Sequence, residues 1–203
     1  MKTVDIAYGE SRLQVNVPDY ADVILPSYPN PFNDPQREVS QSILNPVNSF
    51  NLKDLVDENY KIAISICDVT RPMPSKVVLS ALLSELNYVE NSNITIIIAT
   101  GTHRETTSSE IKQMLGSKIV DNYSIVNHDC FNKDKLVYCG NTSSGIPIWL
   151  NKTWINSTFR ITVGCVEPHF FAGFSGGPKM VAPGLAGQDT IYALHNAEMI
   201  GDG

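Results

Sequence analysis

Two short apolar runs, each followed by a polar loop and a helix candidate, constrain the fold of this chain most. KIAISIC begins at Lys61 and NITIIIA at Asn93, and both have the length and β-branched content of buried strands. Apolar residues at helical spacing follow in SKVVLSALLSEL and in SSEIKQMLG, which Gly116 can cap. Strand, loop and helix repeated in this order are typical of a doubly wound sheet. We therefore predict an α/β fold with a mostly parallel, Rossmann-like sheet.

The rest of the chain adds a hairpin, a linker and further strands. TVDIAYG and LQVNVPDYADVILP alternate as an N-terminal β-hairpin does, around a turn candidate at residues 9–11. Residues 26–60 are rich in proline and predict a linker and surface segment, with a polar helix at 38–43. Shorter strands are expected at YSIVNH, KLVYCG, IPIWLN and FRITVG. A helix is expected over residues 189–198.

Composition narrows the class of protein. Of the 203 residues, 42% are hydrophobic and 18% are charged, which is ordinary for a globular chain. The net charge of −6 argues against nucleic acid as a partner, because phosphate binding uses a basic face. There is no apolar signal-peptide core and no run long enough to span a bilayer, so we expect a cytoplasmic protein with no membrane partner. Without a C-x-x-C pair, the cysteines are expected to be reduced and structural rather than zinc ligands: Cys67, Cys130, Cys139 and Cys165.

Polar loops of unusual composition follow three of the strand candidates. DVTRP follows ISIC, TGTHR follows IIIA, and EPHFFAGFSGGPK follows ITVG. Ligands of open parallel sheets bind outside the carboxyl ends of the strands, so these loops are expected to converge on one site. The side chains that would meet there are Asp68, Arg71, His103, Arg104, Glu167, His169 and Lys179.

Each of these residues also has a purely structural interpretation. Asp68 and Thr70 could cap the helix expected after Pro74. Arginines are mostly surface charges, and a single histidine is more often structural than catalytic. His128, in the sequence NHD without a glycine-rich neighbour, keeps that structural interpretation. The joint placement of the others after strand ends favours a site.

The glycine-rich stretch from Gly164 to Gly184 contains five glycines, more than one turn requires. Closely spaced glycines let a backbone approach a ligand or form a nest of N–H groups that holds an anion. Residues 173–177, GFSGG, also match the G-x-S-x-G elbow of serine hydrolases, but the preceding strand ends too far upstream and no helix follows. A P-loop is excluded because Met180, rather than serine or threonine, follows Lys179.

Together these motifs resemble the nickel-dependent lactate racemases, which bind a nickel-pincer nucleotide. The resemblance is carried by DVTRP at 68–72, TGTHR at 100–104, EPHFFAGFSGGPKMVAPG at 167–184 and LHNAEM at 194–199, in the family's order and spacing. It extends from about Lys61 to the end of the chain, and the hairpin is compatible with it. It implies that residues 1–203 are the N-terminal cofactor-binding domain, and that the C-terminal domain of these enzymes, which closes over the substrate, is absent from this chain.

The resemblance also implies a function and a role for each site residue. The family are isomerases that interconvert the enantiomers of lactate by hydride transfer to and from the cofactor, a pyridinium-3,5-bisthiocarboxylic acid mononucleotide made by cofactor-synthesis proteins. Lys179 would tether this nucleotide covalently, and His195 would bind nickel, a metal that suits imidazole nitrogen and soft sulfur. His103 and His169 would be the two acid/base residues. The nucleotide would be held by Asp68, Thr70, Arg71, Gly173, Ser175, Gly176 and Gly177, and Arg71 would also reach the substrate carboxylate.

Two alternatives stay open. The substrate could be another small 2-hydroxy acid, because a pocket discriminates weakly between methylene groups. The chain could also be a nucleotide-binding module that is inactive without its C-terminal domain.

Overall fold

In the computed structural model, the chain divides into two compact units, residues 1–33 and 34–203, which are considered separately. The structure describes residues 1–9, 11–25, 27 and 30–197. In the first unit, β1 (Lys2–Tyr8) pairs antiparallel with β2 (Ser11–Val17), which confirms the predicted N-terminal hairpin. Residue 10 of the predicted turn, residue 198 of the predicted last helix and residues 198 and 199 of the LHNAEM motif lie outside the described residues.

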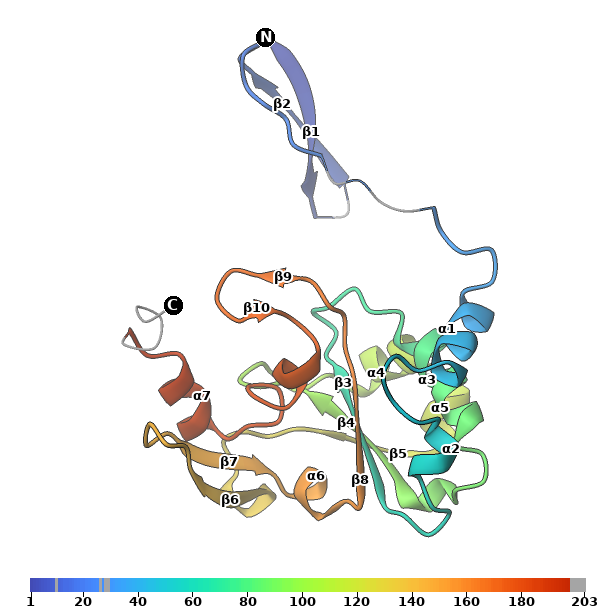
Figure 1. The fold of residues 1–203 in the computed structure, drawn as a ribbon. Helices are drawn as coiled ribbons and strands as arrows, with labels where there is room; N and C mark the ends of the chain where they lie inside the picture. Colours follow the sequence, from blue (N-terminus) through green and yellow to red (C-terminus); the bar gives the residue numbers. More distant parts are fainter. Residues whose placement is uncertain (10, 26, 28–29, 198–203) are drawn as a thin grey trace. The chain divides into compact units, whose positions relative to one another are not determined.

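Four parallel strands form the central sheet of the second unit, in the order β5-β4-β3-β8 (Figure 1). They are β3 (Ile62–Cys67), β4 (Ile94–Ala99), β5 (Ser124–Asn127) and β8 (Phe159–Val163). The chain runs outward from β3 to β5 and then returns to the other side of β3 as β8. The strand order therefore reverses between β3 and β8, the place where open α/β sheets bind ligands. The predicted α/β fold is confirmed.

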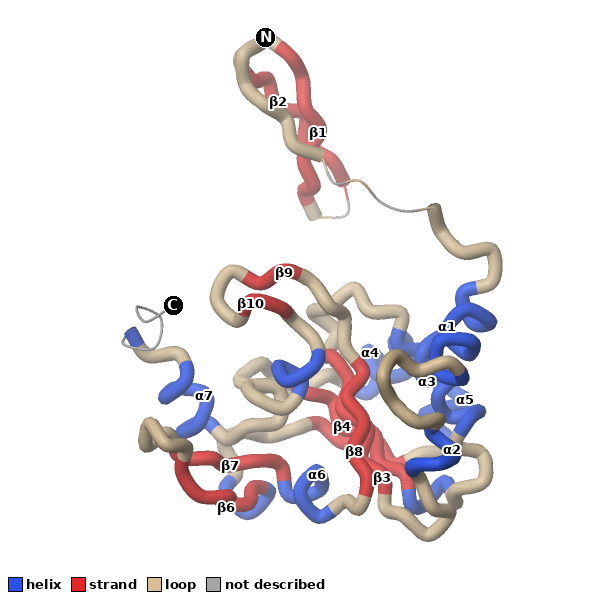
Figure 2. The backbone as a smooth tube through the Cα atoms, in the orientation of Figure 1, coloured by secondary structure: helices blue, strands red, loops and turns tan. Residues whose placement is uncertain are grey.

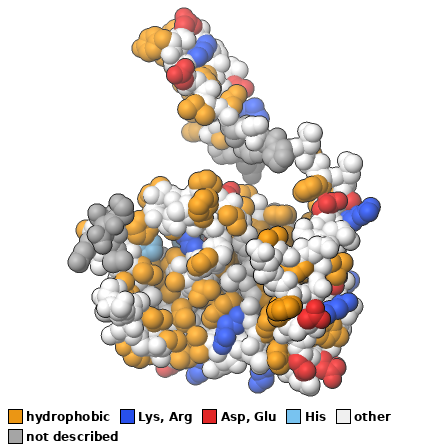
Figure 3. Space-filling model, in the orientation of Figure 1, with side chains coloured by type: hydrophobic (Ala, Val, Ile, Leu, Met, Phe, Trp, Pro, Cys, Tyr) orange, Lys and Arg blue, Asp and Glu red, His pale blue; other side chains and the backbone are white. Residues whose placement is uncertain are grey.

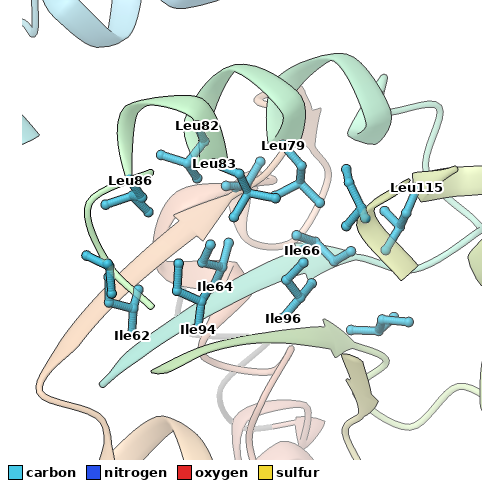
Figure 4. Close-up of a cluster of buried hydrophobic side chains, with 14 of the residues drawn as sticks. Ile62, Ile64, Ile66, Leu79, Leu82, Leu83, Leu86, Ile94, Ile96 and Leu115 are labelled. Atoms are coloured by element: carbon cyan, nitrogen blue, oxygen red, sulfur yellow. The ribbon is translucent and has the colours of Figure 1, made fainter. Parts of the chain in front are cut away.

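Both faces of the sheet are covered, which explains why its central strands read as continuous apolar runs. All six residues of β3 are buried. On one face, its isoleucines pack with three leucines of α3 (Ser75–Glu85) and with Leu86, the residue that follows α3 (Figure 4). The opposite face packs against Trp154 and Leu185. Parallel strands have this pattern because helices or loops cover them on both sides.

Two short helices follow β4. They are α4 (Ser108–Leu115) and α5 (Ser117–Asn122), and Gly116 separates them at a φ of 79°. The helix predicted over SSEIKQMLG is therefore present and ends where the glycine allows a left-handed φ. Its first turn is closed by a capping box, in which Thr107 accepts from the backbone of Glu110 and the carboxylate of Glu110 accepts from Thr107.

The segment 26–60 contains two helices in its described part. They are α1 (Pro35–Leu44), which lies beside α3, and α2 (Leu52–Leu55), and both are drawn as helices in Figure 2. Ile43 and Leu52 pack against the core, and Val56 is buried in it. The helix predicted at residues 38–43 is present as α1, which is longer than the prediction. The assignment of residues 26–60 as a linker and surface segment stays a prediction.

In the last third of the chain, β8 belongs to the main sheet and the other strands lie outside it. The strands β6 (Leu136–Asn141) and β7 (Pro147–Asn151) form an antiparallel hairpin of their own, and α6 (Lys152–Asn156) leads from it into β8. The short strands β9 (Pro168–His169) and β10 (Gly173–Phe174) follow, and then the 3-10 turn η3 (Gly177–Met180). Further 3-10 turns lie at η1 (Asn91–Asn93) and η2 (Lys133–Lys135).

The helix α7 (Gln188–Leu194) ends before residue 198, the end predicted from the sequence. The helix ends where the backbone conformation changes at the next residue. The backbone of His195 leaves the helical conformation, and its N–H is shared between the carbonyls of Ile191 and Tyr192 at 3.1 and 3.3 Å. Among the described residues, no helix has the length and apolar character needed to cross a bilayer.

His128 has the structural role that its sequence context suggested. It is 2% exposed, its Nε2 lies 2.9 Å from the carbonyl of Ala186, and its Nδ1 lies 3.1 Å from the side-chain amide of Asn151. The backbone carbonyl of His128 also accepts from the Thr100 hydroxyl at 2.8 Å. The ring thus ties the end of β5 to β7 and to the segment before α7.

This buried ring should make stability depend on pH. Burial lowers the pKa of His128, and the hydrogen bond to Ala186 only partly offsets it. The unfolded chain then binds the proton more tightly, so stability is full above about pH 6.5 and falls below it, by at most ~1.4 kcal/mol per pH unit. Urea unfolding between pH 7.5 and 5 should show a smaller loss in His128→Gln than in the parent chain. Equal losses in the two proteins would contradict this role.

Candidate functional site

The loops after β3, β4 and β8 meet at the carboxyl edge of the sheet and surround a pocket of about 490 Å³. The pocket lies where the strand order reverses between β3 and β8. In Figure 3, a histidine and a basic side chain lie among hydrophobic side chains between the end of α7 and β10. Nine of the predicted site residues line the pocket, and these are Asp68, Thr70, Arg71, His103, His169, Ser175, Gly176, Lys179 and His195.

The first histidine of the pocket is held by a buried carboxylate. Asp68, directly after β3, is 5% exposed, and its Oδ2 lies 2.6 Å from Nδ1 of His103 in the loop after β4. Its Oδ1 accepts from the backbone N–H and the hydroxyl of Thr70, at 3.1 and 2.6 Å. Burial opposes ionisation of Asp68, but the hydrogen bonds from Thr70 and His103 outweigh it and lower the pKa of the carboxyl group.

The second histidine, His169, lies on β9 at the other side of the pocket. Its Nδ1 accepts from the backbone N–H groups of Phe171 and Ala172, at 3.2 and 3.1 Å. The pKa of His169 is lowered, first by desolvation and then by the positive charges of Lys179 and Arg71. A lowered pKa favours the neutral form of this ring, which lines the pocket.

Lys179 lies in η3, at the base of the glycine-rich loop. Desolvation lowers its pKa, and the nearby charge of Arg71 lowers it further. An amine with a lowered pKa is more often unprotonated and so more nucleophilic, which suits covalent attachment. The 3-10 turn fixes the lysine because Met180 is buried at its end and accepts from the hydroxyl of Ser65 at 3.1 Å.

The third histidine of the pocket, His195, follows α7. Its Nδ1 lies 2.7 Å from the carbonyl of Ile191, which can only accept, so Nδ1 carries the proton and Nε2 keeps its lone pair. The ring of Phe171 lies 5.2 Å away, centroid to centroid. A backbone carbonyl bonded to one ring nitrogen commonly orients a metal-ligating histidine.

The glycine-rich loop folds back on itself. The hydroxyl of Ser175 donates to the carbonyl of Cys165 at 2.6 Å and accepts from the N–H of Glu167 at 2.9 Å. A side chain at Gly176, whose φ is 70°, would come within 3.0 Å of that carbonyl, and Gly164 packs against Gly176 itself. Part of this glycine content therefore serves close packing of the chain. The two hydrogen bonds of the Ser175 hydroxyl likewise hold the loop together, which agrees with the exclusion of a hydrolase elbow.

Four residues expected near the site are placed elsewhere. Arg104 pairs with Glu110 on α4, with Nη–Oε distances of 2.9 and 2.7 Å, and these hydrogen bonds together with Thr107 lower the pKa of Glu110 to about 2. Arg104 therefore supports a helix start outside the pocket. Glu167 is exposed and lies outside the pocket lining as well. Gly173 and Gly177 belong to the loop but do not line the pocket.

Sequence reasoning missed Phe171 and Tyr192, which also line the pocket. Phe171 falls inside the motif EPHFF and could have been found from its place beside His169. Tyr192 lies on α7, three residues before His195, and a helical projection of that segment would have placed both on neighbouring positions. Hydrophobic side chains of this kind exclude water from a pocket and strengthen its polar interactions.

Comparison with known proteins agrees with this architecture. Residues 8–203 match the family described as lactate racemase N-terminal domain. The chain is 37% identical to the lactate racemase of Thermoanaerobacterium thermosaccharolyticum and 35% identical to that of Lactiplantibacillus plantarum, over 98% of its own length in each case. It spans about half the length of these curated relatives, 48% of each.

Solved structures give the same result. The lactate racemase apoprotein from Thermoanaerobacterium thermosaccharolyticum superimposes with a TM-score of 0.86 at 36% identity, covering 97% of this chain and 47% of that one. A protein from Thermotoga maritima, at 23% identity and a TM-score of 0.67 over 80% of this chain and 41% of that one, shares the fold. The motifs, the sheet order and the match over nearly the whole length lead to one conclusion: this chain belongs to the lactate racemase N-terminal domain family.

Proposed function

We propose that this chain is the cofactor-binding half of a racemase that interconverts the enantiomers of lactate, or of a related small 2-hydroxy acid. The observation that carries the proposal is the shared pocket of three histidines and Lys179 at the strand-order reversal. We further propose that residues 1–203 form the N-terminal domain of a cytoplasmic enzyme. A C-terminal domain would add the remaining substrate contacts, and cofactor-synthesis proteins would load the site.

The residues present fit a nickel-pincer nucleotide. No group of three His, Cys, Asp or Glu side chains that could hold a metal occurs among residues 1–9, 11–25, 27 and 30–197. In this proposal, Nε2 of His195 would be the imidazole donor to the metal, the cofactor would supply the other ligands, and Lys179 would be the attachment point. When bound, the cofactor would supply the acceptor and donor of the substrate hydride.

His103 and His169 are the proposed acid/base residues. They come from different strand ends, His103 after β4 and His169 on β9, and so stand in different loops around one pocket. The two enantiomers of a 2-hydroxy acid present their hydroxyl groups differently, so a racemase needs a proton acceptor for each. Imidazole titrates near neutral pH and suits this exchange.

Arg71 is the proposed anchor for the substrate carboxylate. It is exposed within the pocket lining, and its Nη1 lies 3.4 Å from the hydroxyl of Thr70. A guanidinium group binds a carboxylate or a phosphate through paired hydrogen bonds. We propose that Arg71 and Thr70, with backbone amides of the loop 173–177, hold the nucleotide.

Two incubations test this function. The chain is co-produced with cofactor-synthesis proteins, alone and joined to the C-terminal half of a lactate racemase, and each product is incubated with L-lactate. We expect D-lactate, resolved by chiral chromatography, from the joined protein. Absence of D-lactate from a joined protein that contains cofactor and nickel would contradict the proposal. If the joined protein forms D-lactate and the loaded chain alone does not, the chain is a binding module without its partner domain. The same assay with 2-hydroxybutyrate tests the alternative substrate class.

A further inference from the structure

The two histidines assigned to acid/base chemistry have hydrogen-bond partners of opposite kinds. Nδ1 of His103 faces Oδ2 of Asp68 at 2.6 Å. The other oxygen of Asp68 already accepts two hydrogen bonds from Thr70, and a carboxylate so surrounded stays ionised because these donors lower its pKa. An ionised carboxylate only accepts, so the proton between the two residues belongs to Nδ1. Neutral His103 therefore has its lone pair on Nε2.

Nδ1 of His103 donates a hydrogen bond, whereas Nδ1 of His169 accepts hydrogen bonds. Its Nδ1 faces two backbone N–H groups, those of Phe171 and Ala172. A backbone N–H only donates, so Nδ1 must provide the lone pair. The proton of neutral His169 is then on Nε2.

We propose that the resting site holds the two histidines in opposite tautomers, so that they are not interchangeable. His103, positioned by Asp68, is ready to accept a hydroxyl proton at Nε2. His169 is a hydrogen-bond donor at Nε2 until the loop between β9 and β10 releases its Nδ1. The roles toward substrate rest on the function proposed above, whereas the tautomers are properties of the chain itself.

The proton balance at His103 follows from this arrangement. The O–H bond of the substrate breaks, its electron pair stays on the oxygen, and the proton forms a bond to Nε2. The resulting imidazolium keeps its Nδ1–H on Asp68, whose negative charge is buried next to it. His169 cannot do the same in place, because a proton on Nδ1 would face the N–H groups of Phe171 and Ala172.

The same contacts change the role assigned to Asp68. The sequence resemblance placed it among the residues that hold the nucleotide. Both of its oxygens accept hydrogen bonds, one from His103 and one from Thr70, and its side chain is 6% exposed. We therefore assign Asp68 as a positioning residue for His103.

The direct test is a long-range ¹H–¹⁵N spectrum of the 203-residue chain, labelled with ¹⁵N-histidine, at pH 8. The chain has four histidines, and His103→Gln and His169→Gln identify the two ring systems by loss of their signals. We expect a protonated Nδ1 and an unprotonated Nε2 for His103, and the reverse for His169. The same tautomer in both rings would overturn the proposal, whatever reaction the protein catalyses.

A second measurement tests the role of Asp68. Asp68→Asn should move His103 toward the Nε2–H tautomer, since an amide can donate to Nδ1, and should leave His169 unchanged. Asp189→Asn, which removes a carboxylate that pairs with Lys133 and does not line the pocket, is the matched control. In a loaded racemase, Asp68→Asn should lower kcat by about 10²–10⁴-fold while nucleotide and nickel content stay the same. An unchanged His103 tautomer, or a loss of bound nucleotide, would overturn the assignment.

Discussion

Replacing His103 by alanine should lower kcat for racemisation by about 10²–10⁴-fold in both directions, in an enzyme completed by the C-terminal domain. Both directions are affected because a complete racemisation uses one histidine to begin and the other to finish, so neither can be spared. The same loss is expected for His169→Ala. Initial rates from L-lactate and from D-lactate, measured at saturating substrate, give the two values.

The control for this prediction is next to His103 in the sequence. Arg104→Ala removes a side chain that pairs with Glu110 outside the pocket, so it should leave kcat near that of the parent enzyme. Nickel and nucleotide content should be unchanged in the histidine variants. Near-normal rates in both directions for His103→Ala would refute a two-histidine mechanism.

Replacing His195 by alanine should remove most of the bound nickel while the nucleotide stays attached to Lys179. The carbonyl of Ile191 fixes the proton of His195 on Nδ1 and leaves Nε2 for a metal. With the imidazole gone, the metal would keep only the ligands of the cofactor. Metal analysis by mass spectrometry and the intact protein mass give nickel and adduct on the same sample.

The other histidines supply the comparison for this variant. His128 cannot take over as ligand, because it is buried and both of its ring nitrogens are hydrogen-bonded. His103→Ala should keep its nickel, which separates a ligand from an acid/base residue. A His195→Ala protein with full nickel content would show that the ligand is another group.

The sheet and the position of the pocket could be predicted because they depend on strong local patterns. Six consecutive buried residues in Ile62–Cys67 and the apolar run of β4 leave few alternatives to a parallel sheet. The loops after such strands must then lie at one edge. The N-terminal hairpin was predictable for the same reason, from its alternating pattern.

The direction of individual side chains could not be predicted, because it depends on hydrogen bonds between distant segments. Arg104 follows the same strand as His103 but turns to Glu110, six residues further on. Asp68 forms hydrogen bonds with Thr70 and with His103, 35 residues away, and the sequence did not indicate this contact. The helix α7 ends at Leu194, and the residue after it, His195, has a non-helical backbone conformation. Spacing alone carries none of this information.

The most direct test of the account is to locate the cofactor on the chain. The 203-residue protein is co-produced with cofactor-synthesis proteins, its intact mass is measured, and a proteolytic digest is mapped by tandem mass spectrometry. We expect one adduct of nucleotide mass on the peptide that contains Lys179, and none on that peptide in Lys179→Ala. Lys152, which is exposed and outside the pocket lining, is the control position. An adduct on any lysine other than Lys179, or an adduct that persists in Lys179→Ala, would contradict the account.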